Sequence, residues 1–489
     1  MAKYHIHDLK SLKKYFQTID NPIFAVGARP YNLTIGMMNL AKHFEILAAK
    51  GTAQETADLE KVTKITYLQK AHRIFRDKNN FQNYLSKKPS DLFRDKTIIT
   101  YLDSFKNPPI LLFFKITKET LRLLKSKPYF KIYSDLRMFN KYENKIIFFR
   151  LLKKLGIETP KNTVLKATKL DYALLKKELG EKFVIQLPSM ALGSGTFFIL
   201  KEKDYHDMLQ KPAIKEAIAN KTSLRITRYI NCESSPSMTV CVTKFGVIFT
   251  GLQKQIIDAK EVLEKGRRSG VYCGHDWSAS SFDKSIEQQA QLVAQKVGDY
   301  FQAKENFHGI FGIDFVLEKG TNKLYPIEAN VRLLGSFPAL SMVQESAGQP
   351  LIQGIQVLES LSRNDYILDI PALNAEMTKN KTGAHINLYA KDNCYVYVSG
   401  NIKPGIYQIN EKDKTATYLR SGLFFSDLKN NTEILVTSGV PFKSKVYKQH
   451  DNILKLISRH AFLDKNNQLN DFIKVMIHFA YKKLALKKI

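Results

Sequence analysis

The strongest chemical pattern in this sequence is a pair of oxygen-bearing side chains in an apolar stretch. In "LYPIEANVRLLGS", which begins at Leu324, Glu328 and Asn330 are two residues apart and Arg332 follows them. Side chains alternate between the two faces of a strand, so Glu328 and Asn330 should share one face. Oxygen ligands at this spacing suit a hard cation such as Mg2+. An edge strand whose polar residues face water is the alternative.

A second carboxylate joins this pair if the segment folds as a β-hairpin. The apolar run "GIFGIDFVL" precedes it, and a polar loop that contains glycine separates the two runs near Thr321. Asp314 would then lie opposite Glu328, and cross-strand neighbours are about 5 Å apart. Two buried carboxylates that close repel each other unless a cation lies between them. The pattern therefore predicts a divalent-metal site at Asp314, Glu328 and Asn330, with a solvent-facing hairpin as the alternative.

A glycine-rich turn between two apolar runs could hold a phosphate. In "FVIQLPSMALGSGTFFI", Gly193 and Gly195 would let backbone N–H groups approach an anion, and Ser194 and Thr196 could add hydroxyls. A plain hairpin turn explains the same residues equally well. The turn is neither a Walker loop, since no GK[ST] follows, nor a dinucleotide fingerprint, since a strand rather than a helix follows.

The stretch from residue 264 to 280, "EKGRRSGVYCGHDWSAS", mixes charged, aromatic and glycine residues. Arg267 and Arg268 suit carboxylate recognition through paired hydrogen bonds. His275 and Asp276 precede the only tryptophan, Trp277. Polar loops with aromatic residues often determine specificity, and a surface loop with incidental charges is the alternative.

Three units should position these residues. Residues 1–130 predict an α/β domain, in which the strand Ile23 to Val26 ends at Gly27 and in which "TIITYLD" and "PILLFFKI" are predicted as buried strands of a parallel sheet. A strand that ends in such a glycine turn often opens a ligand crevice. Residues 131–370 predict a second domain of strands and amphipathic helices, which holds all the chemical motifs above.

Residues 371–489 predict a β-rich third unit that ends in a helix capped by Asn470 or Asp471. Phe472, Val475 and Phe479 follow helical spacing, and we expect them to pack against the strands of this unit. Lysines crowd the end of the helix, where cations complement the helix dipole. A basic amphipathic helix on a membrane surface is the alternative.

Composition places the chain among soluble globular proteins. Hydrophobic residues make up 44% and charged residues 25% of its 489 residues. Lys and Arg number 75 against 46 Asp and Glu, a formal charge of +29. That charge invites a nucleic-acid or anionic-membrane partner, but the excess is mostly scattered lysine, so a solvated lysine-rich surface is the simpler interpretation.

No zinc site, disulfide framework or membrane span is expected. None of the four cysteines forms a CxxC pair. The N-terminus lacks the apolar core of a signal peptide, and "PPILLFFKI" is too short to span a bilayer. We expect a cytoplasmic protein.

Taken in order, four segments resemble the ATP-grasp superfamily of carboxylate–amine ligases. They are "NKIIFFRLLKKLGIETP", "KFVIQLP" with the following "GSGTFFI", "RYI", and the Asp…Glu-x-Asn hairpin with its arginine, and together they span roughly residues 144–349. The resemblance implies an α/β (α+β) fold. It would comprise a pre-ATP-grasp α/β domain, an ATP-grasp domain with antiparallel sheets, and an extra β-rich C-terminal unit.

The resemblance also assigns roles to residues. Asp314, Glu328 and Asn330 match Mg2+ (or Mn2+) ligands, Lys145 matches a lysine that reaches the nucleotide phosphates, and Arg332 matches an arginine that holds the phosphate or acyl phosphate. The same resemblance completes an ATP site with Gln186, Gly193, Ser194, Gly195, Thr196, the hinge residues Arg228, Tyr229 and Ile230, and Glu233 as a ribose contact. Arg267, Arg268, His275 and Asp276 would face the substrates.

The implied activity is an ATP-dependent ligase that joins a carboxylate to an amine through an acyl phosphate. Its substrates would be small-molecule or peptide carboxylates and amines, without specific nucleic acid, and a homodimer is compatible with it. Gln186 stands where a second lysine is common in the family, Arg228 where glutamate is common, and Val331 where proline is usual. These departures keep two alternatives open, a non-catalytic nucleotide-binding or scaffold protein and a basic protein that binds anionic surfaces.

Overall fold

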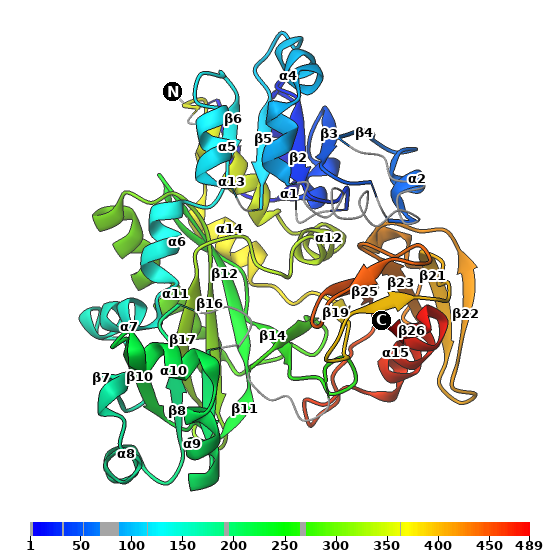
Figure 1. The fold of residues 1–489 in the computed structure, drawn as a ribbon. Helices are drawn as coiled ribbons and strands as arrows, with labels where there is room; N and C mark the ends of the chain where they lie inside the picture. Colours follow the sequence, from blue (N-terminus) through cyan, green and yellow to red (C-terminus); the bar gives the residue numbers. More distant parts are fainter. Residues whose placement is uncertain are drawn as a thin grey trace.

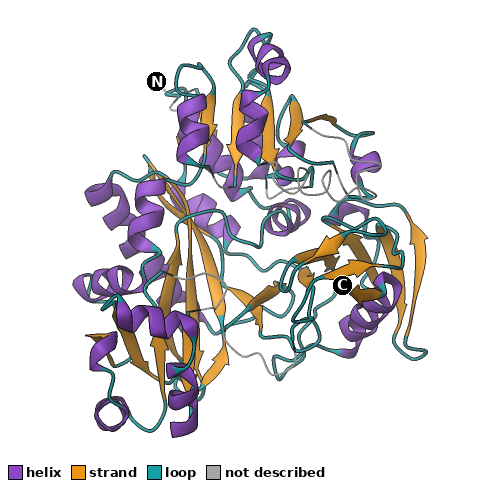
Figure 2. Cartoon of the chain, in the orientation of Figure 1, coloured by secondary structure: helices purple, strands orange, loops and turns teal. Residues whose placement is uncertain are grey.

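The computed structural model describes residues 3–31, 34–51, 53–68, 88–114, 116–189, 195–264, 270–361 and 363–489. Three regions are visible in Figures 1 and 2: an α/β layer at the top, a set of long strands flanked by helices at the left, and a β-rich unit at the right. The mixed α/β architecture that the sequence predicts is confirmed.

The α/β layer is built on a parallel sheet of order β4-β3-β2-β5-β6. The chain moves outward from β2 to β3 and β4, and then crosses to β5 on the other side. The carboxyl ends of β2 and β5 therefore form a topological switch point, where such sheets usually bind ligands. The elements are β2 (Ile23–Gly27), β3 (Phe44–Ala48), β4 (Lys64–Tyr67), β5 (Ile110–Phe113), β6 (Phe130–Ile132), α1 (Leu9–Phe16), α2 (Thr56–Leu59), α4 (Lys96–Asp103) and α5 (Lys118–Leu123).

One predicted strand of this layer is a helix. "PILLFFKI" does contain β5, but "TIITYLD" lies in α4, so the strand prediction for it was wrong. Asp95 caps this helix by accepting hydrogen bonds from the backbone N–H groups of Thr97 and Ile98. Ile98 and Leu102 are buried four residues apart, which is the spacing of one helical face.

A small antiparallel sheet of order β7-β10-β8-β9 forms the lower left part of the molecule in Figure 1. Its strands pair in registers that place Arg225 beside Gln186, and Gln186 beside Thr196. The elements are β7 (Asn162–Lys166), β8 (Phe183–Gln186), β9 (Thr196–Ile199), β10 (Ser223–Arg228), α8 (Tyr172–Leu179), α9 (Glu202–Leu209) and α10 (Pro212–Ala219).

A long sheet joins the second and third units. It runs β11-β16-β12-β14-β15-β19-β25-β23-β21-β22, with β13 and β17 as side branches. Its strands are β11 (Cys232–Ser234), β12 (Pro236–Thr243), β13 (Gly246–Phe249), β14 (Gln253–Ile257), β15 (Tyr272–Asp276), β16 (Gly309–Glu318), β17 (Lys323–Asn330), β19 (Ala384–Tyr389), β21 (Gly405–Asn410), β22 (Thr415–Arg420), β23 (Glu433–Thr437) and β25 (Asn452–Ser458).

The junction between the two units lies inside this sheet, at the pairing of β15 with β19. Gly274 lies opposite Ile386, and a Cβ atom on Gly274 would overlap the carbonyl oxygen of His385. Only glycine allows the two backbones to approach this closely. One hydrogen-bonded sheet therefore continues across the boundary that we expect near residue 370.

Helices cover the long sheet and connect the regions. The helix α11 packs against β12 and β13, and α7 packs against β17. The N-terminal strand β1 (Tyr4–Ile6) pairs with β18 (Tyr366–Leu368), which ties the start of the chain to the end of the second unit. The remaining helices are α6 (Leu136–Tyr142), α7 (Lys145–Lys154), α11 (Lys284–Glu305), α12 (Ala339–Ser346), α13 (Ile352–Leu361) and α14 (Ile370–Met377).

The C-terminal helix packs as the sequence predicts. Asn470 caps α15 (Asp471–Leu484) through the backbone N–H of Ile473. Phe472 and Met476 are buried in the core of the third unit, where Val475 and Phe479 are partly buried. The apolar face of α15 is therefore covered, which favours the structural role over the membrane-surface alternative. Within the described ranges, no helix is both long and apolar enough to cross a bilayer.

We expect the substitution Met476→Ala to lower the free energy of unfolding by about 2–4 kcal/mol, because it leaves a cavity beneath α15. His478, two residues further on, is exposed. The control substitution His478→Ala should change the free energy by less than about 0.5 kcal/mol. Urea denaturation followed by circular dichroism measures both, and equal effects would show that α15 does not pack on the third unit.

Burial of Lys455 on β25 makes stability depend on pH. Its ammonium group donates to Asn387 Oδ1 at 2.6 Å, and burial lowers the pKa of Lys455 to about 7. Between that value and the ordinary lysine pKa near 10.4, the unfolded chain holds one proton more than the folded chain, so this group makes stability rise with pH. Below pH 7 both states are protonated and the contribution is constant.

The substitution Lys455→Met should remove this part of the pH dependence. The slope of the unfolding free energy between pH 7.5 and 9.5 should fall by about 1 kcal/mol per pH unit relative to the unaltered protein. Urea midpoints at several pH values measure it. An unchanged slope would mean that Lys455 stays charged in the folded state.

Candidate active site

The predicted hairpin is present and brings its carboxylates together. The strands β16 and β17 pair with Asp314 opposite Glu328 and Gly312 opposite Asn330. Along β16, Ile313 and Phe315 are buried, whereas Asp314 between them is only half-buried. The amide of Asn330 donates to Asp314 Oδ2 at 2.7 Å. The three side chains therefore share one face, as the alternation predicts.

A buried lysine completes this cluster. Lys145 Nζ lies 3.0 Å from Glu328 Oε2, and the Lys145 side chain is almost fully buried. Its position follows from the start of α7, where Asn144 Oδ1 accepts a hydrogen bond from the backbone N–H of Ile146 at 3.0 Å. The backbone N–H of Lys145 also donates to the carbonyl of Pro188, just beyond β8. The cap thus aims the first side chain of α7 at the hairpin.

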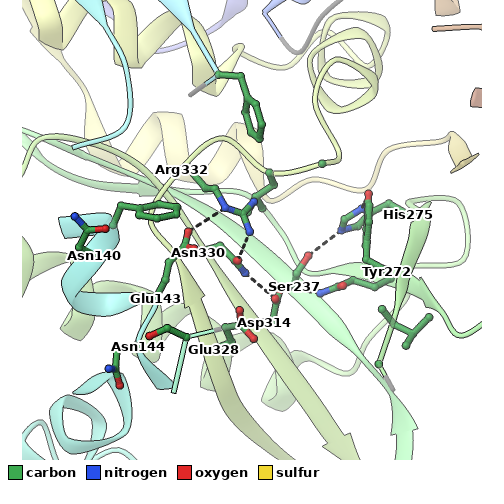
Figure 3. A pocket seen from close by; sticks show the side chains of 18 residues that line it. Asn140, Glu143, Asn144, Ser237, Tyr272, His275, Asp314, Glu328, Asn330 and Arg332 are labelled. Carbon is green, nitrogen blue, oxygen red and sulfur yellow. Dashed lines mark hydrogen bonds and ion pairs between the residues drawn. The ribbon is translucent and has the colours of Figure 1, made fainter. Parts of the chain in front are cut away.

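Arg332 is held between two acceptors. Its Nη2 donates to Asn330 Oδ1 at 2.7 Å, and its Nε lies 2.9 Å from Glu143 Oε1 (Figure 3). Glu143 follows α6 and immediately precedes the cap of α7. Sequence reasoning did not select Glu143. Its position next to "NKIIFF" is a signal that could have identified it.

Burial and mutual repulsion disfavour the ionised carboxylates of this cluster, although Lys145 and Arg332 are close to them. Burial and then the charge of Glu328 raise the pKa of Asp314 to about 7. Burial also raises the pKa of Glu143 to about 7, although Arg332 opposes that shift. A cation between Asp314 and Glu328 would relieve both the repulsion and the cost of burial.

The donor set fits a hard cation. Two carboxylates and the amide of Asn330 offer oxygen atoms of the kind that Mg2+ and Mn2+ prefer. In the described part of the chain, no group of three or more His, Cys, Asp and Glu residues is placed to hold a metal ion. The candidate site therefore depends on the amide as its third ligand, and because Asn330 Oδ1 here accepts from Arg332 while its Nδ2 donates to Asp314, the amide would have to turn to present its oxygen to the metal.

These residues line a cavity of about 470 Å3. Glu143, Glu328 and Arg332 form one wall, and Phe114 from the carboxyl end of β5 also lines it. The cavity therefore extends from the hairpin to the switch point of the N-terminal sheet.

The other wall is polar and uncharged. Gln255 donates to Asp314 Oδ1 at 2.7 Å, and Ser237 Oγ lies 2.9 Å from His275 Nε2. Tyr272 holds the other ring nitrogen of His275 at 2.7 Å. Burial lowers the pKa of His275 to about 3, so its ring is neutral near pH 7. This wall offers hydrogen bonds without net charge.

The four substrate residues predicted from the sequence separate in the structure. His275 lines the cavity, whereas Arg267 and Arg268 lie outside the described residues. Asp276 does not reach the cavity, because adjacent residues of strand β15 point to opposite faces. Its carboxylate instead accepts hydrogen bonds from the backbone N–H groups of Ala279, Phe462 and Leu463. Asp276 thus ties the two units together, which corrects its predicted role.

The residues expected to bind nucleotide lie on the small antiparallel sheet. Gln186 donates to Thr196 Oγ1 at 3.3 Å across β8 and β9, and Gly195 precedes Thr196. Gly193 and Ser194 lie outside the described residues. The structure therefore describes only the second half of the predicted phosphate loop.

The predicted hinge follows β10. Arg228 forms a paired ion contact with Glu318, its Nη1 lying 2.6 Å from Oε1, so its charge is already balanced. Tyr229 and Ile230 follow it, and Tyr229 donates its backbone N–H to the carbonyl of Lys182. Glu233 on β11 is exposed. These positions leave the adenine and ribose contacts as predictions.

Arg225 is a buried cation that sequence reasoning did not select. It lies beside Gln186 in the pairing of β10 and β8, and its side chain is 1% exposed. Its Nη1 donates to the carbonyl of Ile327 at 3.0 Å, and its guanidinium lies 4.7 Å from the ring centre of Phe149. Arg225 therefore holds the backbone of β17 at Ile327, the residue that directly precedes Glu328. A charged residue between Leu224 and Ile226 in an apolar strand was its sequence signal.

Comparison with known proteins agrees with this geometry. Residues 142–336 match the family of the ATP-grasp domain. The biotin carboxylase of Campylobacter jejuni, solved as a β,γ-ATP complex, has 13% sequence identity and a TM-score of 0.58, over 96% of this chain and 92% of that chain. The biotin carboxylase domain of the Hydrogenobacter thermophilus 2-oxoglutarate carboxylase has 14% identity and a TM-score of 0.55, over 90% and 86%.

A third solved structure, an ADP complex of N5-carboxyaminoimidazole ribonucleotide synthetase, has 12% identity and a TM-score of 0.51, over 95% of this chain and 99% of that chain. These likenesses show that the fold is shared along most of each chain. The family match covers the hairpin, Lys145 and Arg332. Residues 142–336 of this chain therefore form an ATP-grasp domain.

Proposed function

We propose that this protein is an ATP-dependent ligase that joins a carboxylate to an amine through an acyl phosphate. The observation that carries the proposal is the convergence of Asp314, Glu328 and Asn330 with Lys145 and Arg332 beside one cavity. The similar structures support ATP and a divalent metal as its cofactors, since one holds MgADP with bicarbonate and another an ATP-type ligand.

The metal would be held by Asp314, Glu328 and Asn330. When bound, a divalent cation neutralises charge on phosphate oxygens, which favours phosphoryl transfer. Lys145 lies against Glu328 and would add a positive charge on the phosphate side. Further hydrogen-bond donors to the phosphates would be backbone N–H groups after β8, near Gly195.

The first chemical step needs positioning and charge rather than a protein nucleophile. An oxygen of the substrate carboxylate attacks the γ-phosphorus, the bond to the bridging oxygen breaks, and ADP leaves. Arg332 would hold the new acyl phosphate. Because Glu143 and Asn330 already orient its guanidinium, little reorganisation is needed as charge develops.

The second step would take place against the uncharged wall. The amine nitrogen attacks the carbonyl carbon, the carbon–oxygen bond to phosphate breaks, and the nitrogen releases its proton to water. Ser237, Gln255 and Tyr272 can form hydrogen bonds with an uncharged amine substrate, and these uncharged side chains would not compete with the carboxylates for the metal. The neutral state of His275 keeps this wall free of like charge toward an amine.

The non-catalytic alternative depends on Gln186 and Arg228. Gln186 brings no charge to the strand before the phosphate loop, and Arg228 is already paired with Glu318. The retained hairpin argues for catalysis, because a protein that only binds nucleotide has no need to hold two like charges against each other. Turnover distinguishes the two functions.

Purified protein with Mg·ATP should release ADP only when a matching carboxylate and amine are both present. The carboxylate pools should include bicarbonate, because one similar structure holds it. A coupled ADP assay over pools of carboxylates and amines measures this. Binding of ATP without ADP release from any pool would favour the non-catalytic alternative.

The substitution Glu328→Gln should abolish ATP turnover, by about 100-fold or more, while the protein remains folded. It removes a metal ligand, the repulsion with Asp314 and the ion pair with Lys145, whose effects on stability oppose each other, so circular dichroism should accompany the assay to show that the variant is folded. Glu158, an exposed residue of the same domain, provides the matched control Glu158→Gln. Turnover by Glu328→Gln at the rate of the control would exclude the hairpin as the metal site.

A further inference from the structure

The carboxyl ends of β2 and β3 carry two cations. Arg29 follows β2 after Gly27, and Lys50 follows β3, and both side chains are partly exposed. The two segments continue side by side beyond the strands, since Lys50 donates its backbone N–H to the carbonyl of Ala28 at 3.0 Å. Ligands of open α/β sheets bind in the crevice beyond such strand ends.

The third unit packs directly against these strand ends. Glu55, which is fully buried, accepts hydrogen bonds from the backbone N–H groups of Gly439 and Val440. The backbone of Gln54 donates to the carbonyl of Val440 at 2.9 Å. The loop after β23 is therefore fixed to the N-terminal domain, and Lys445 lies at the far end of this loop.

The positive charges gather around this contact. Arg29 Nη1 lies 2.7 Å from the position that a Cβ atom on Gly439 would occupy. Burial lowers the pKa of Lys445 well below its ordinary value, and the charges of Arg29 and Lys50 add to that shift, while Glu55 opposes it. The three cations thus lie within electrostatic reach of one another.

Lys445 has an unmet need for an acceptor. Its side chain is 7% exposed, and among the described residues its ammonium nitrogen is fully enclosed without a hydrogen-bond partner. The ring centre of Tyr447 lies 5.2 Å from Lys445 Nζ, and the face of the ring can interact with at most one of the N–H groups of the ammonium. An ammonium group donates up to three hydrogen bonds, and buried donors in native proteins are almost always paired, with protein, water or an ion.

The nearby carboxylates do not supply that acceptor. Both oxygens of Glu55 already accept backbone N–H groups, and among the described residues Lys445 Nζ has no hydrogen-bond partner. Asp451 accepts from the backbone of Lys448 in its own loop. Arg29, Lys50 and Lys445 therefore lie near two carboxylates, Glu55 and Asp451, both of which accept backbone hydrogen bonds.

We propose that Arg29, Lys50 and Lys445 form an anion-binding site between the N-terminal sheet and the third unit, for the phosphate or carboxylate group of a small molecule. Arg29 and Lys50 are open enough to contact the anion, and Lys445 adds its charge from the enclosed side. This site is separate from the hairpin and does not depend on the proposed ligase activity. An anion bound here would fasten the two units against each other.

Binding of inorganic phosphate by the full-length protein tests the site. Isothermal titration at constant ionic strength should show phosphate binding that weakens by about tenfold or more in Lys445→Met and in Arg29→Gln. Lys443→Met is the matched control, because Lys443 lies two residues away and is exposed. Methionine keeps the stem of Lys445 and removes its buried charge, so this variant should fold.

Phosphate affinities that do not differ between Lys445→Met and Lys443→Met would overturn the proposal, as would the absence of phosphate binding to the unaltered protein. Any phosphate held in the hairpin cavity affects all variants equally and cancels. Glycerol phosphate and succinate distinguish the source of the anion. Tighter binding of either one than of inorganic phosphate supports a site for an organic substrate, whereas a preference for inorganic phosphate supports a site for the free anion.

Discussion

The opposition of Asp314 and Glu328 across β16 and β17 is the constraint on which the catalytic half of the molecule depends. Like charges directly opposite each other in an antiparallel pair are unfavourable, and burial increases the cost. Several elements contribute to holding them. Lys145 pairs with Glu328, while Asn330 and Gln255 donate to Asp314. Even so, the pKa of Asp314 stays near 7, so the protein alone does not fully compensate the pair.

That constraint explains the arrangement of the neighbouring elements. α7 must begin at Lys145 for its ammonium group to reach Glu328, and the Asn144 cap and the contact with Pro188 fix that start. The strands β12, β14 and β15 lie on the other side of β16 and supply the uncharged wall. A charged wall and a neutral wall therefore face each other because the hairpin lies between the start of α7 and the neighbouring strands of the long sheet.

Local patterns predicted the parts of this site that lie close together in the chain. Strand alternation predicted the shared face of Glu328 and Asn330, and the hairpin predicted their partner Asp314. The same rules failed where neighbours come from distant segments. The apolar residues of "TIITYLD" are compatible with a strand or with a helix, and the hydrogen bonds that Asp95 accepts from the following backbone N–H groups favour the helix. Asp276 was assigned to a loop, but pairing with β19 makes it part of a strand and turns it away from the cavity.

Arg225 shows the limit of sequence reasoning from another direction. Its charge in an apolar strand was visible, but the carbonyl of Ile327 and the ring of Phe149 that surround it come from β17 and α7. Neither contact follows from the spacing within "SLRITRYI". The continuity of the long sheet through Gly274 was equally hidden, because a close approach of two backbones depends on both strands.

In the described part of the chain, like charges gather at the hairpin and at the junction beyond β2 and β3, and the signs of the two groups are opposite. The hairpin gathers carboxylates that a metal would neutralise, and the junction beyond β2 and β3 gathers cations that an anion would neutralise. In both, burial shifts the pKa of a central group toward its neutral form, upward for Asp314 and downward for Lys445. A ligand that restores the charged form binds the folded chain and not the unfolded one, so its binding adds to stability by mass action. The net charge of +29 says nothing of this, because it sums the lysines on the surface. The informative charges are the few that the fold encloses, since each one specifies the sign of the ligand that would accompany it.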